Sequence, residues 1–487
     1  MITANREQQV LDSVPDGLLI EGRWEQGLRE AIQVQNPATG RVIKTIANAT
    51  PEDGIRALDA AVEAAAEWAA TPARVRGEIL RRAFDLLQER RDDFALLMTL
   101  EMGKPLVEAN SEVTYGGEFL RWFSEEAVRV QGRYGSTPEG TGTMVVSQRP
   151  VGPCFFITPW NFPLAMATRK IAPALAAGCT VVVKPAELTP LTTLAFAQLL
   201  MDAGLPAGVL NVIPTSTSSQ VSAPIIADPR LRKLSFTGST PVGRTLLAQA
   251  AQNVLRTSME LGGNAPFIVF DDADLDAAVD GAMVAKFRNV GQACTAANRF
   301  IVHQSVAAEF ARRIVERVNS LVVGPGTQDS VTIGPLIDDR AVASISALVD
   351  DAVQRGARLV SGGHAVAGDG CFFEPTVLLD VPQGSDILST EIFGPILAVT
   401  TFETEDEAIS RANDTEFGLI GYAFTQDLAR GQRLIQCIDT GMMGLNTGLV
   451  SNAAAPFGGV KQSGLGREGG QEGIHEYLDV KYTLIPN

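Results

Sequence analysis

Two rhythms of apolar and polar residues run along the chain, one with the period of a helix and one typical of buried strands. At residues 50–53 a threonine, a proline and two acidic residues form the signal for the start of a helix. Apolar residues then recur at helical spacing, at Ile55, Leu58, Val62 and Ala65. Residues 75–98 carry a second apolar stripe of this kind. We therefore expect a helix from Pro51 onwards and another helical block over residues 75–98.

The pattern changes from residue 144 onwards. Short apolar runs alternate with helical stretches rich in alanine and leucine, which predicts strands at residues 180–184, 209–213, 233–237 and 266–270. Strands and helices that alternate at this spacing are typical of parallel α/β sheets. A second α/β unit follows after residue 270. Its expected helices and strands are helices 274–287 and 307–321 and strands 300–303 and 396–402.

Residues 144–150 alternate between apolar and polar side chains, as a half-exposed hairpin or arm would. We expect the segment after Tyr477 to pair with this arm. The coarse division is then one α/β domain before residue ~265 and another after it, with boundaries that are soft by several residues.

The composition narrows the class of protein. The formal net charge of −16 disfavours nucleic acid and anionic membrane surfaces as partners, because an acidic surface repels both. Five unpaired cysteines indicate a reducing compartment, and three histidines remote from any cysteine pair give no zinc site. The N-terminus has no apolar signal core, and the longest apolar stretch, residues 171–183, is shorter than the ~20 residues of a membrane span. We expect a cytoplasmic protein that binds no metal.

Cys294 is a candidate nucleophile, because it lies in a polar stretch after a helix and a glycine, with Arg288 six residues upstream. Exposure and positive surroundings are what lower the pKa of a thiol enough to form a thiolate. The alternative is a small apolar residue of the core, the interpretation that also suits the other cysteines. Glu260 ends an apolar strand before a glycine pair, where partial burial would raise its pKa towards that of a useful base. Taken alone, the segment favours the alternative, a surface glutamate.

Three further segments could bind ligands. Asn161 lies in the proline-fixed loop 159–163 and could donate hydrogen bonds to an oxyanion, although a plain turn asparagine is the alternative. Residues 236–243 follow a predicted strand and open a helix, which suits a phosphate. Residues 464–469 match G-x-G-x-x-G, but no strand precedes them, and we reject them as a dinucleotide fingerprint. Lys184 and Glu187 could hold a ribose, or could be ordinary solvated charges.

Together these segments resemble the aldehyde dehydrogenase superfamily over nearly the whole chain. The motifs PWNFP, KPAE, FTGST, MELGG, FRNVGQAC, EIFGP and PFGGVKQSG occur in the order of that family. The resemblance implies an α/β fold with a Rossmann-like NAD-binding domain (residues 1–130 and 151–262) and a catalytic α/β domain (263–445). It also implies a β oligomerisation arm (131–150 and 476–487) and a homodimer or homotetramer.

The same resemblance assigns roles to residues. Cys294 would be the nucleophile, Glu260 the general base and Asn161 the oxyanion donor, beside the backbone N–H of Cys294. The implied cofactor contacts are Trp160, Lys184, Glu187, Gly238, Ser239, Glu391 and Phe393. Because the carboxylate of Glu187 accepts from a ribose 2′-hydroxyl and repels a 2′-phosphate, NAD is the expected cofactor, with NADP as the alternative.

Within the superfamily the chain resembles succinate-semialdehyde dehydrogenases at Arg169, Arg288 and Ser451, which in those enzymes bind the far carboxylate of the substrate. Guanidinium forks suit a carboxylate, whereas the alternative for Arg169 is a purely structural arginine. Phe162 and Phe457 would line the apolar tunnel.

The expected function is NAD-dependent oxidation of succinate semialdehyde to succinate through a thiohemiacetal and a thioester. The alternatives are glutarate semialdehyde or another ω-carboxy aldehyde, a cofactor-free thiol acyltransferase or esterase, and a non-catalytic homologue. The intact cofactor motifs argue against the acyltransferase or esterase. The presence of both Cys294 and Glu260 argues against a non-catalytic homologue.

Overall fold

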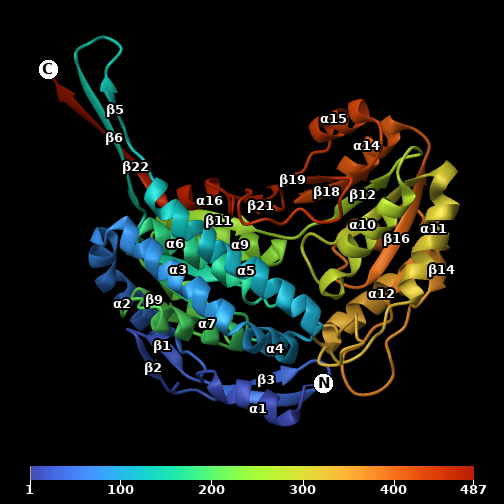
Figure 1. Ribbon diagram of the computed structural model, residues 1–487, viewed down its shortest axis with the longest axis horizontal. Coiled ribbons are helices and arrows are strands. Elements are labelled where there is room, and N and C mark those ends of the chain that lie inside the picture. Colours follow the sequence, from blue (N-terminus) through green and yellow to red (C-terminus); the bar gives the residue numbers. More distant parts are fainter. Residues whose placement is uncertain (1) are drawn as a thin grey trace.

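Two large sheets divide the chain into two lobes, from which a β arm projects (Figure 1). The computed structural model describes residues 2–487. The first lobe contains an eight-stranded sheet whose five central strands, β9, β8, β7, β10 and β11, are parallel, as the α/β pattern predicts. In spatial order its strands are β2 (Arg23–Glu25), β1 (Leu18–Ile20), β9 (Leu210–Val212), β8 (Val181–Lys184), β7 (Cys154–Ile157), β10 (Lys233–Thr237), β11 (Arg256–Glu260) and β21 (Gly464–Leu465).

Helices surround this sheet, and the hairpin of β3 (Ile32–Asn36) and β4 (Arg41–Ile46) lies outside it. The predicted helix start is confirmed, since the Thr50 hydroxyl accepts from the Asp53 N–H and the Asp53 carboxylate accepts from the Thr50 N–H. The helices of this lobe are α1 (Ala4–Ser13), α2 (Pro51–Ala70), α3 (Ala73–Glu89), α4 (Arg91–Met102), α5 (Leu106–Glu126), α6 (Ala165–Ala177), α7 (Leu191–Asp202), α8 (Ser218–Ala227), α9 (Thr240–Ala250) and α16 (Glu472–His475).

The helical block expected over residues 75–98 is two helices, α3 and α4. Arg90 separates them with φ −100° and ψ 19°. Leu87 of α3 and Phe94 and Leu97 of α4 are all buried, and their spacing fits that of one helix although the break lies between them. A periodicity that persists on both sides of a break does not reveal the break.

The second lobe contains a seven-stranded sheet, in agreement with the second predicted α/β unit. Strand 396–402 is found with the predicted bounds, and strand 300–303 begins three residues earlier, at Ala297. The sheet order is β14 (Arg358–Ser361), β15 (Thr376–Leu379), β16 (Ile396–Phe402), β13 (Ala297–His303), β12 (Ala265–Val269), β18 (Ile420–Phe424) and β19 (Met442–Leu445). Its helices are α10 (Leu275–Phe287), α11 (Gln304–Asn319), α12 (Asp339–Arg355), α13 (Asp386–Ser389), α14 (Glu405–Asn413) and α15 (Leu428–Cys437), and the short pair β17 (Phe417–Gly418) and β20 (Val460–Lys461) lies beside it.

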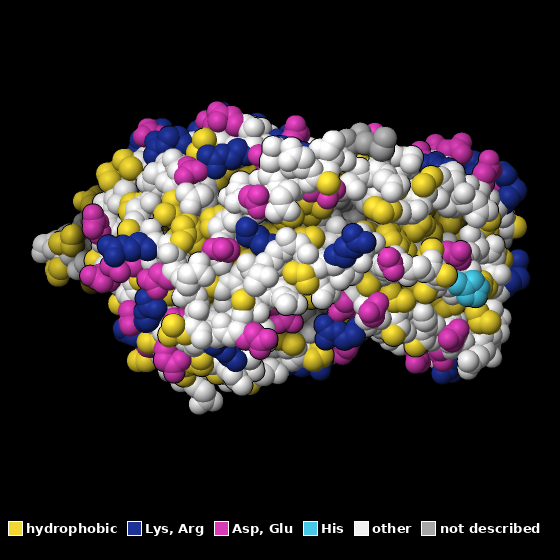
Figure 2. Space-filling view, turned by 90° about the horizontal axis from the view of Figure 1, so that it is seen from below, with side chains coloured by type: hydrophobic (Ala, Val, Ile, Leu, Met, Phe, Trp, Pro, Cys, Tyr) yellow, Lys and Arg dark blue, Asp and Glu magenta, His cyan; other side chains and the backbone are white. Residues whose placement is uncertain are grey.

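The arm is a three-stranded antiparallel sheet of β5 (Arg133–Ser136), β6 (Gly142–Pro150) and β22 (Leu478–Pro486). The predicted pairing of the C-terminal segment with the arm is confirmed over nine residue pairs, from Leu478↔Pro150 to Pro486↔Gly142. Large apolar side chains are exposed on the arm, and Figure 2 shows apolar side chains at the end of the molecule from which it projects. They include Tyr134, Val480, Tyr482, Leu484 and Ile485. Among the described residues, no helix is long and apolar enough to cross a membrane.

The parallel strands of the first sheet place the motifs at one edge. The carboxyl ends of parallel strands meet at the same edge of a sheet, which is where open α/β sheets bind ligands. β7, β8, β10 and β11 deliver the loop 158–164, Lys184, Gly238 and Glu260 to that edge. In the second lobe the loop between α10 and β13 carries Cys294.

Candidate active site

A cavity of about 220 Å³ brings together residues from both lobes. The first lobe contributes Asn161 and Glu260, and the second contributes Cys294. All three residues that we predicted to be catalytic therefore line one space. The predicted cofactor contacts that line the same space are Trp160, Gly238, Ser239, Glu391 and Phe393.

The loop that carries Cys294 has an unusual backbone. Asn289, Val290 and Gly291 all have positive φ, at 55°, 60° and 72°. A Cβ on Gly291 would lie 2.2 Å from the Gly394 carbonyl oxygen, so only glycine fits at this point of the turn. This tight turn after α10 presents the half-buried Cys294 to the cavity.

Burial raises the pKa of the Cys294 thiol to about 12, and the neighbouring carboxyls of Glu391 and Glu260 act in the same direction. The guanidinium groups of Arg169 and Arg288 oppose this shift without cancelling it. The positive surroundings that we expected to lower this pKa are therefore present, but desolvation outweighs them. In the free protein Cys294 is therefore a thiol at neutral pH, and a nucleophilic role would require a proton acceptor.

Glu260 lines the same cavity and is a candidate for that acceptor. It ends β11 and is 2% exposed, and neither of its carboxyl oxygens has a hydrogen-bond partner among residues 2–487. Burial raises its pKa well above the usual range, and the carboxyl of Glu468 raises it further, while Arg169 and Lys170 lower it. A buried carboxyl with both oxygens free is chemically suited to take up and release protons.

The loop from β7 to α6 holds Asn161 in place. Its side-chain Nδ2 donates to the Gln292 carbonyl at 3.1 Å, so one of its two N–H groups already has an acceptor. Its backbone carbonyl accepts from Lys104 Nζ at 2.9 Å and from Asn289 Nδ2 at 3.1 Å. Lys104 also forms a buried ion pair with Glu112, so a side chain from outside the loop fixes the position of Asn161.

The cofactor side of the cavity suits a dinucleotide. The rings of Trp160 and Phe393 meet edge to face with centroids 5.4 Å apart. Glu391 accepts from the Gly263 N–H at 3.1 Å, and burial raises its pKa to about 7. Aromatic walls, a carboxyl for ribose hydroxyls and the buried, unpaired Thr237 hydroxyl are the groups that a nicotinamide nucleoside needs.

Lys184 and Glu187 lie at the end of β8 and do not line this cavity. Lys184 Nζ donates to the Pro185 carbonyl at 3.0 Å and to the Ser218 hydroxyl at 3.2 Å. Burial lowers the pKa of Lys184 to about 8, and Glu187 is the nearby carboxylate that opposes this shift. The two side chains are therefore electrostatic neighbours at the carboxyl end of β8, the strand next to β7, and lie outside the cavity that Trp160 and Phe393 line.

A second cavity, of about 210 Å³, contains three of the five predicted substrate contacts: Phe162, Arg288 and Ser451. Arg288 lies 5.3 Å from the centroid of the Phe162 ring, close enough for a cation–π contact. Phe162 directly follows Asn161, so the two cavities lie on neighbouring residues of one loop.

Arg169 and Phe457 do not line the second cavity. Arg169 is 1% exposed, forms an ion pair with Glu468 and stacks 4.2 Å over the Phe457 ring. The ion pair with Glu468 therefore supports the interpretation of Arg169 as a structural residue. However, Arg169 also lies within hydrogen-bonding reach of the buried Tyr115 hydroxyl, and Tyr115 lines the second cavity, so Arg169 connects the Glu468 cluster to that cavity.

Sequence reasoning missed several residues of this region. Lys170 donates to Glu468 and, at 3.0 Å, to the Ser235 hydroxyl, and Glu468 pairs with both Arg169 and Lys170. The rejected glycine motif 464–469 contains Glu468 and forms the edge strand β21 along β11. The sequence did contain one signal: Lys170 lies within a largely apolar segment, and a charged residue that is buried requires a partner of opposite charge. The missed residues are Lys104, Glu108, Glu112, Tyr115, Lys170 and Glu468.

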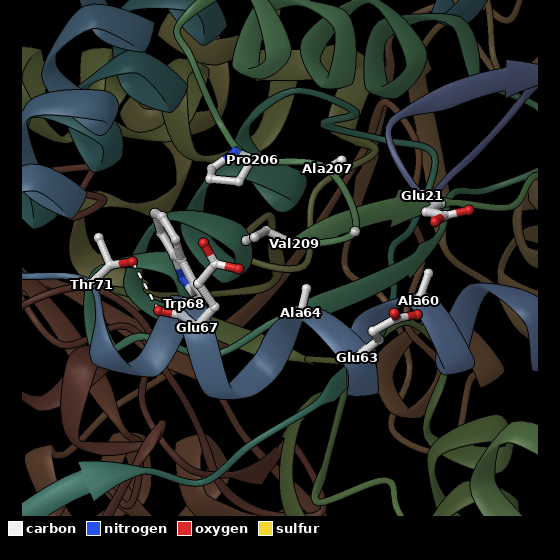
Figure 3. Close-up of a pocket in the computed structure, with 11 residues that line it drawn as sticks. Glu21, Ala60, Glu63, Ala64, Glu67, Trp68, Thr71, Pro206, Ala207 and Val209 are labelled. Atoms are coloured by element: carbon white, nitrogen blue, oxygen red, sulfur yellow. Dashed lines mark hydrogen bonds between the residues drawn. The ribbon is translucent and has the colours of Figure 1, made fainter.

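A third cavity, of about 220 Å³, lies between α2 and the loop that precedes β9 (Figure 3). Glu63, Glu67 and Trp68 of α2 face Pro206 and Val209 across it. None of the predicted site residues lines this cavity. The described residues contain no group of histidine, cysteine or carboxylate side chains arranged to hold a metal.

A doubly wound sheet whose ligand-binding edge faces a cavity with a cysteine and a buried glutamate is typical of an α/β oxidoreductase. The chain belongs to the aldehyde dehydrogenase family, whose sequence profile matches residues 24–483, and the protein is an aldehyde dehydrogenase. Enzymes of this family use NAD or NADP.

Named relatives cover almost the whole chain. A succinate-semialdehyde dehydrogenase of Paenarthrobacter nicotinovorans is 61% identical over 91% of this chain and 99% of its own. An NADP-type succinate-semialdehyde dehydrogenase of Escherichia coli is 48% identical (96% and 97%), and a glutarate-semialdehyde dehydrogenase of Pseudomonas aeruginosa is 49% identical (96% and 96%). The crystal structure of a Staphylococcus aureus betaine aldehyde dehydrogenase with NAD+ has a TM-score of 0.96 at 35% identity (99% and 97%).

The raised pKa of Cys294 predicts how the free protein reacts with iodoacetamide. Because only the thiolate is alkylated, the rate at Cys294 should rise about tenfold for each pH unit between about pH 7 and 9, with no plateau. Peptide mass spectrometry would separate Cys294 from the exposed Cys437. A plateau below about pH 8 would show that the thiol is already activated in the free protein.

The buried cluster around Glu468 predicts a large loss of stability on neutralisation. Glu468→Gln leaves Arg169 and Lys170 buried without a counter-charge, which should cost about 3–5 kcal/mol. Thermal unfolding followed by circular dichroism would measure the loss against Glu472→Gln, an exposed carboxylate in α16. An unfolding midpoint equal to that of the control would contradict the structural role of Glu468.

Proposed function

We propose that the protein oxidises succinate semialdehyde to succinate with NAD as the oxidant. The observation that carries this proposal is the cavity in which Arg288 and Ser451 lie next to the two loops that carry Asn161 and Cys294. A guanidinium and a hydroxyl at the far end of an aldehyde pocket suit a substrate that carries a carboxylate there. The named functions of two relatives support the same substrate.

The reaction begins at Cys294. Its sulfur adds to the aldehyde carbon as its proton leaves for a nearby acceptor, and the resulting alkoxide accepts hydrogen bonds from the Asn161 amide and the Cys294 backbone N–H. NAD, when bound beside Trp160, Glu391 and Phe393, would supply the hydride acceptor for this carbon, and the oxidation would leave a thioester on Cys294. Glu260 then takes a proton from water as the water attacks the thioester, and succinate departs with the thiol restored.

The cavity surroundings favour this division of roles. Glu260 is buried and unpaired, so its raised pKa makes the ionised form a stronger base than an exposed glutamate. Arg169 lies near Cys294 and Tyr115, and we include it with Tyr115 among the donors to the substrate carboxylate. Phe162 supplies an apolar wall, whereas Phe457 acts through Arg169, on which it stacks.

Glutarate semialdehyde is the second candidate, favoured by the name of the Pseudomonas aeruginosa relative. The two substrates differ by one methylene, which changes binding by only about 1–3 kcal/mol. Both carry the distal carboxylate that the cavity suits, so the choice between them is one of chain length.

For the cofactor we propose NAD over NADP. Glu187 lies in the electrostatic range of Lys184 at the end of β8, where the adenosine ribose of a doubly wound fold binds. A carboxylate there accepts from a 2′-hydroxyl and repels a 2′-phosphate. The NADP-type Escherichia coli relative makes NADP the alternative.

The exposed apolar strands of the arm favour a homo-oligomer. Tyr482, Leu484 and Ile485 of β22 and Tyr134 of β5 are each about half or more exposed. Apolar area of this kind on a projecting sheet is stabilised by burial against another chain. We propose that a second copy of this chain covers it, in a homodimer or homotetramer.

Initial rates with succinate semialdehyde, glutarate semialdehyde and butyraldehyde test the substrate. Arg288→Leu should raise KM about 10- to 100-fold for the two acids, through the loss of roughly 1.5–3 kcal/mol of charge-assisted hydrogen bonding, and little for butyraldehyde. Equal losses on all three aldehydes would contradict a carboxylate role for Arg288. Wild-type rates as high on butyraldehyde as on the acids would overturn the semialdehyde assignment.

Glu187→Ser tests the cofactor. Removal of the carboxylate removes both the acceptor for the 2′-hydroxyl and the repulsion of the 2′-phosphate, so kcat/KM for NADP relative to NAD should rise at least about tenfold. The measurement is the ratio of the two kcat/KM values with one aldehyde at saturation. An unchanged ratio would show that Glu187 does not distinguish the 2′-hydroxyl of NAD from the 2′-phosphate of NADP.

A further inference from the structure

Two carboxylates line the cavity that contains Arg288 and Ser451, and one of them, Glu112, is paired with Lys104. The other, Glu108, lies in the first turn of α5. The Glu108 carboxylate accepts from the Asn289 backbone N–H at 2.9 Å, so it is held beside the residue that follows Arg288. An acidic side chain in a pocket for an acidic substrate needs an explanation, because like charges in one pocket repel.

Two cations and one neutral hydroxyl lie near Glu108. Lys104 precedes α5, but it forms its own buried ion pair with Glu112, one turn further along the helix. Arg288 lies across the cavity, and its guanidinium lowers the pKa of Glu108. Tyr115 also lines the cavity, and burial raises the pKa of its hydroxyl, which keeps it neutral. Among the described residues Arg288 is the only cation that lines this cavity, and it has no ion pair with a carboxylate.

We propose that Glu108 is a specificity-determining residue that competes with the carboxylate of the substrate for Arg288. This inference rests on the proposed function and deepens it. When Glu108 is neutral, the charge of Arg288 is fully available to the substrate. When Glu108 is ionised, it partly neutralises Arg288 and repels the substrate carboxylate, so the preference for ω-carboxy aldehydes weakens.

The charge state of Glu108 changes within the physiological range. Burial raises its pKa to about 7, with Lys104, the Asn289 N–H and Arg288 opposing the shift. Glu108 is an acid, so it is mostly neutral below this value and mostly charged above it. The substrate carboxylate has an ordinary pKa near 4.5 and stays ionised throughout. The preference for the acid over a neutral aldehyde should therefore fall as the pH rises through about 7.

The test is the ratio of kcat/KM for succinate semialdehyde to kcat/KM for butyraldehyde, measured between about pH 6 and 8.5 at constant ionic strength. Titration of Cys294 and Glu260 affects both aldehydes and cancels in this ratio. For the wild type the ratio should fall about threefold to tenfold across the range, as expected for one screened like charge in a half-buried pocket.

Glu108→Gln keeps an acceptor for the Asn289 N–H and removes the charge. Its ratio should not depend on pH and should equal or exceed the wild-type value at low pH. Glu118→Gln is the matched control, because it removes a carboxylate from the same helix at a position that pairs with Arg121 on the surface. Its ratio should follow that of the wild type.

The outcomes separate the two proposals. A flat wild-type ratio, or a Glu108→Gln ratio that falls as steeply as the wild-type ratio, overturns the role of Glu108 and leaves the semialdehyde assignment intact. The flat wild-type result decides the matter even if the variant fails to fold. A wild-type ratio near one at every pH overturns the proposed function, and the competition at Arg288 with it.

Discussion

Helix α6 is buried from its first residue to its last, and the charges that it carries constrain the rest of the site. Arg169 and Lys170 follow each other on this helix, and an unpaired buried cation costs several kcal/mol. Glu468 meets both of them from a segment near the C-terminus. The pairing holds this segment close to β21, whose residues Gly464 and Leu465 pair with the end of β11. The position of Glu260 therefore depends on a charge balance in the helix behind it.

The same principle operates at the start of α6. Glu112 accepts from the backbone N–H groups of Leu164 and Ala165, where a helix favours negative charge, and Lys104 balances it. Lys104 also holds the Asn161 carbonyl. One ion pair thus fixes the end of the loop that carries Asn161, the proposed oxyanion donor, and the Glu468 cluster fixes the other side of the helix. Because both pairs are buried, they are rigid, and rigid support is what a catalytic amide requires.

The sequence predicted the parallel sheets, the arm pairing and the motifs that meet at Cys294, because periodicity and motif order are local properties. Its failures have non-local causes. Lys170 and Glu468 are 298 positions apart, and nothing near either residue indicates the other. The break at Arg90 is invisible because the apolar spacing continues across it. The pKa of Cys294 rises although two arginines lie near it, since the degree of burial is a property of the folded protein.

Charged groups of the site divide according to whether they have partners. Lys104 pairs with Glu112, and Lys170 pairs with Glu468. These two ion pairs stabilise the positions of the elements that carry them. Glu260 has no hydrogen-bond partner, and Cys294 is uncharged at neutral pH. A buried group without a partner is stabilised most by a ligand that brings an opposite charge or accepts a proton. In the proposed reaction, proton transfer therefore falls to Glu260 and Cys294, which the fold leaves without partners, while the paired charges keep these two residues in position.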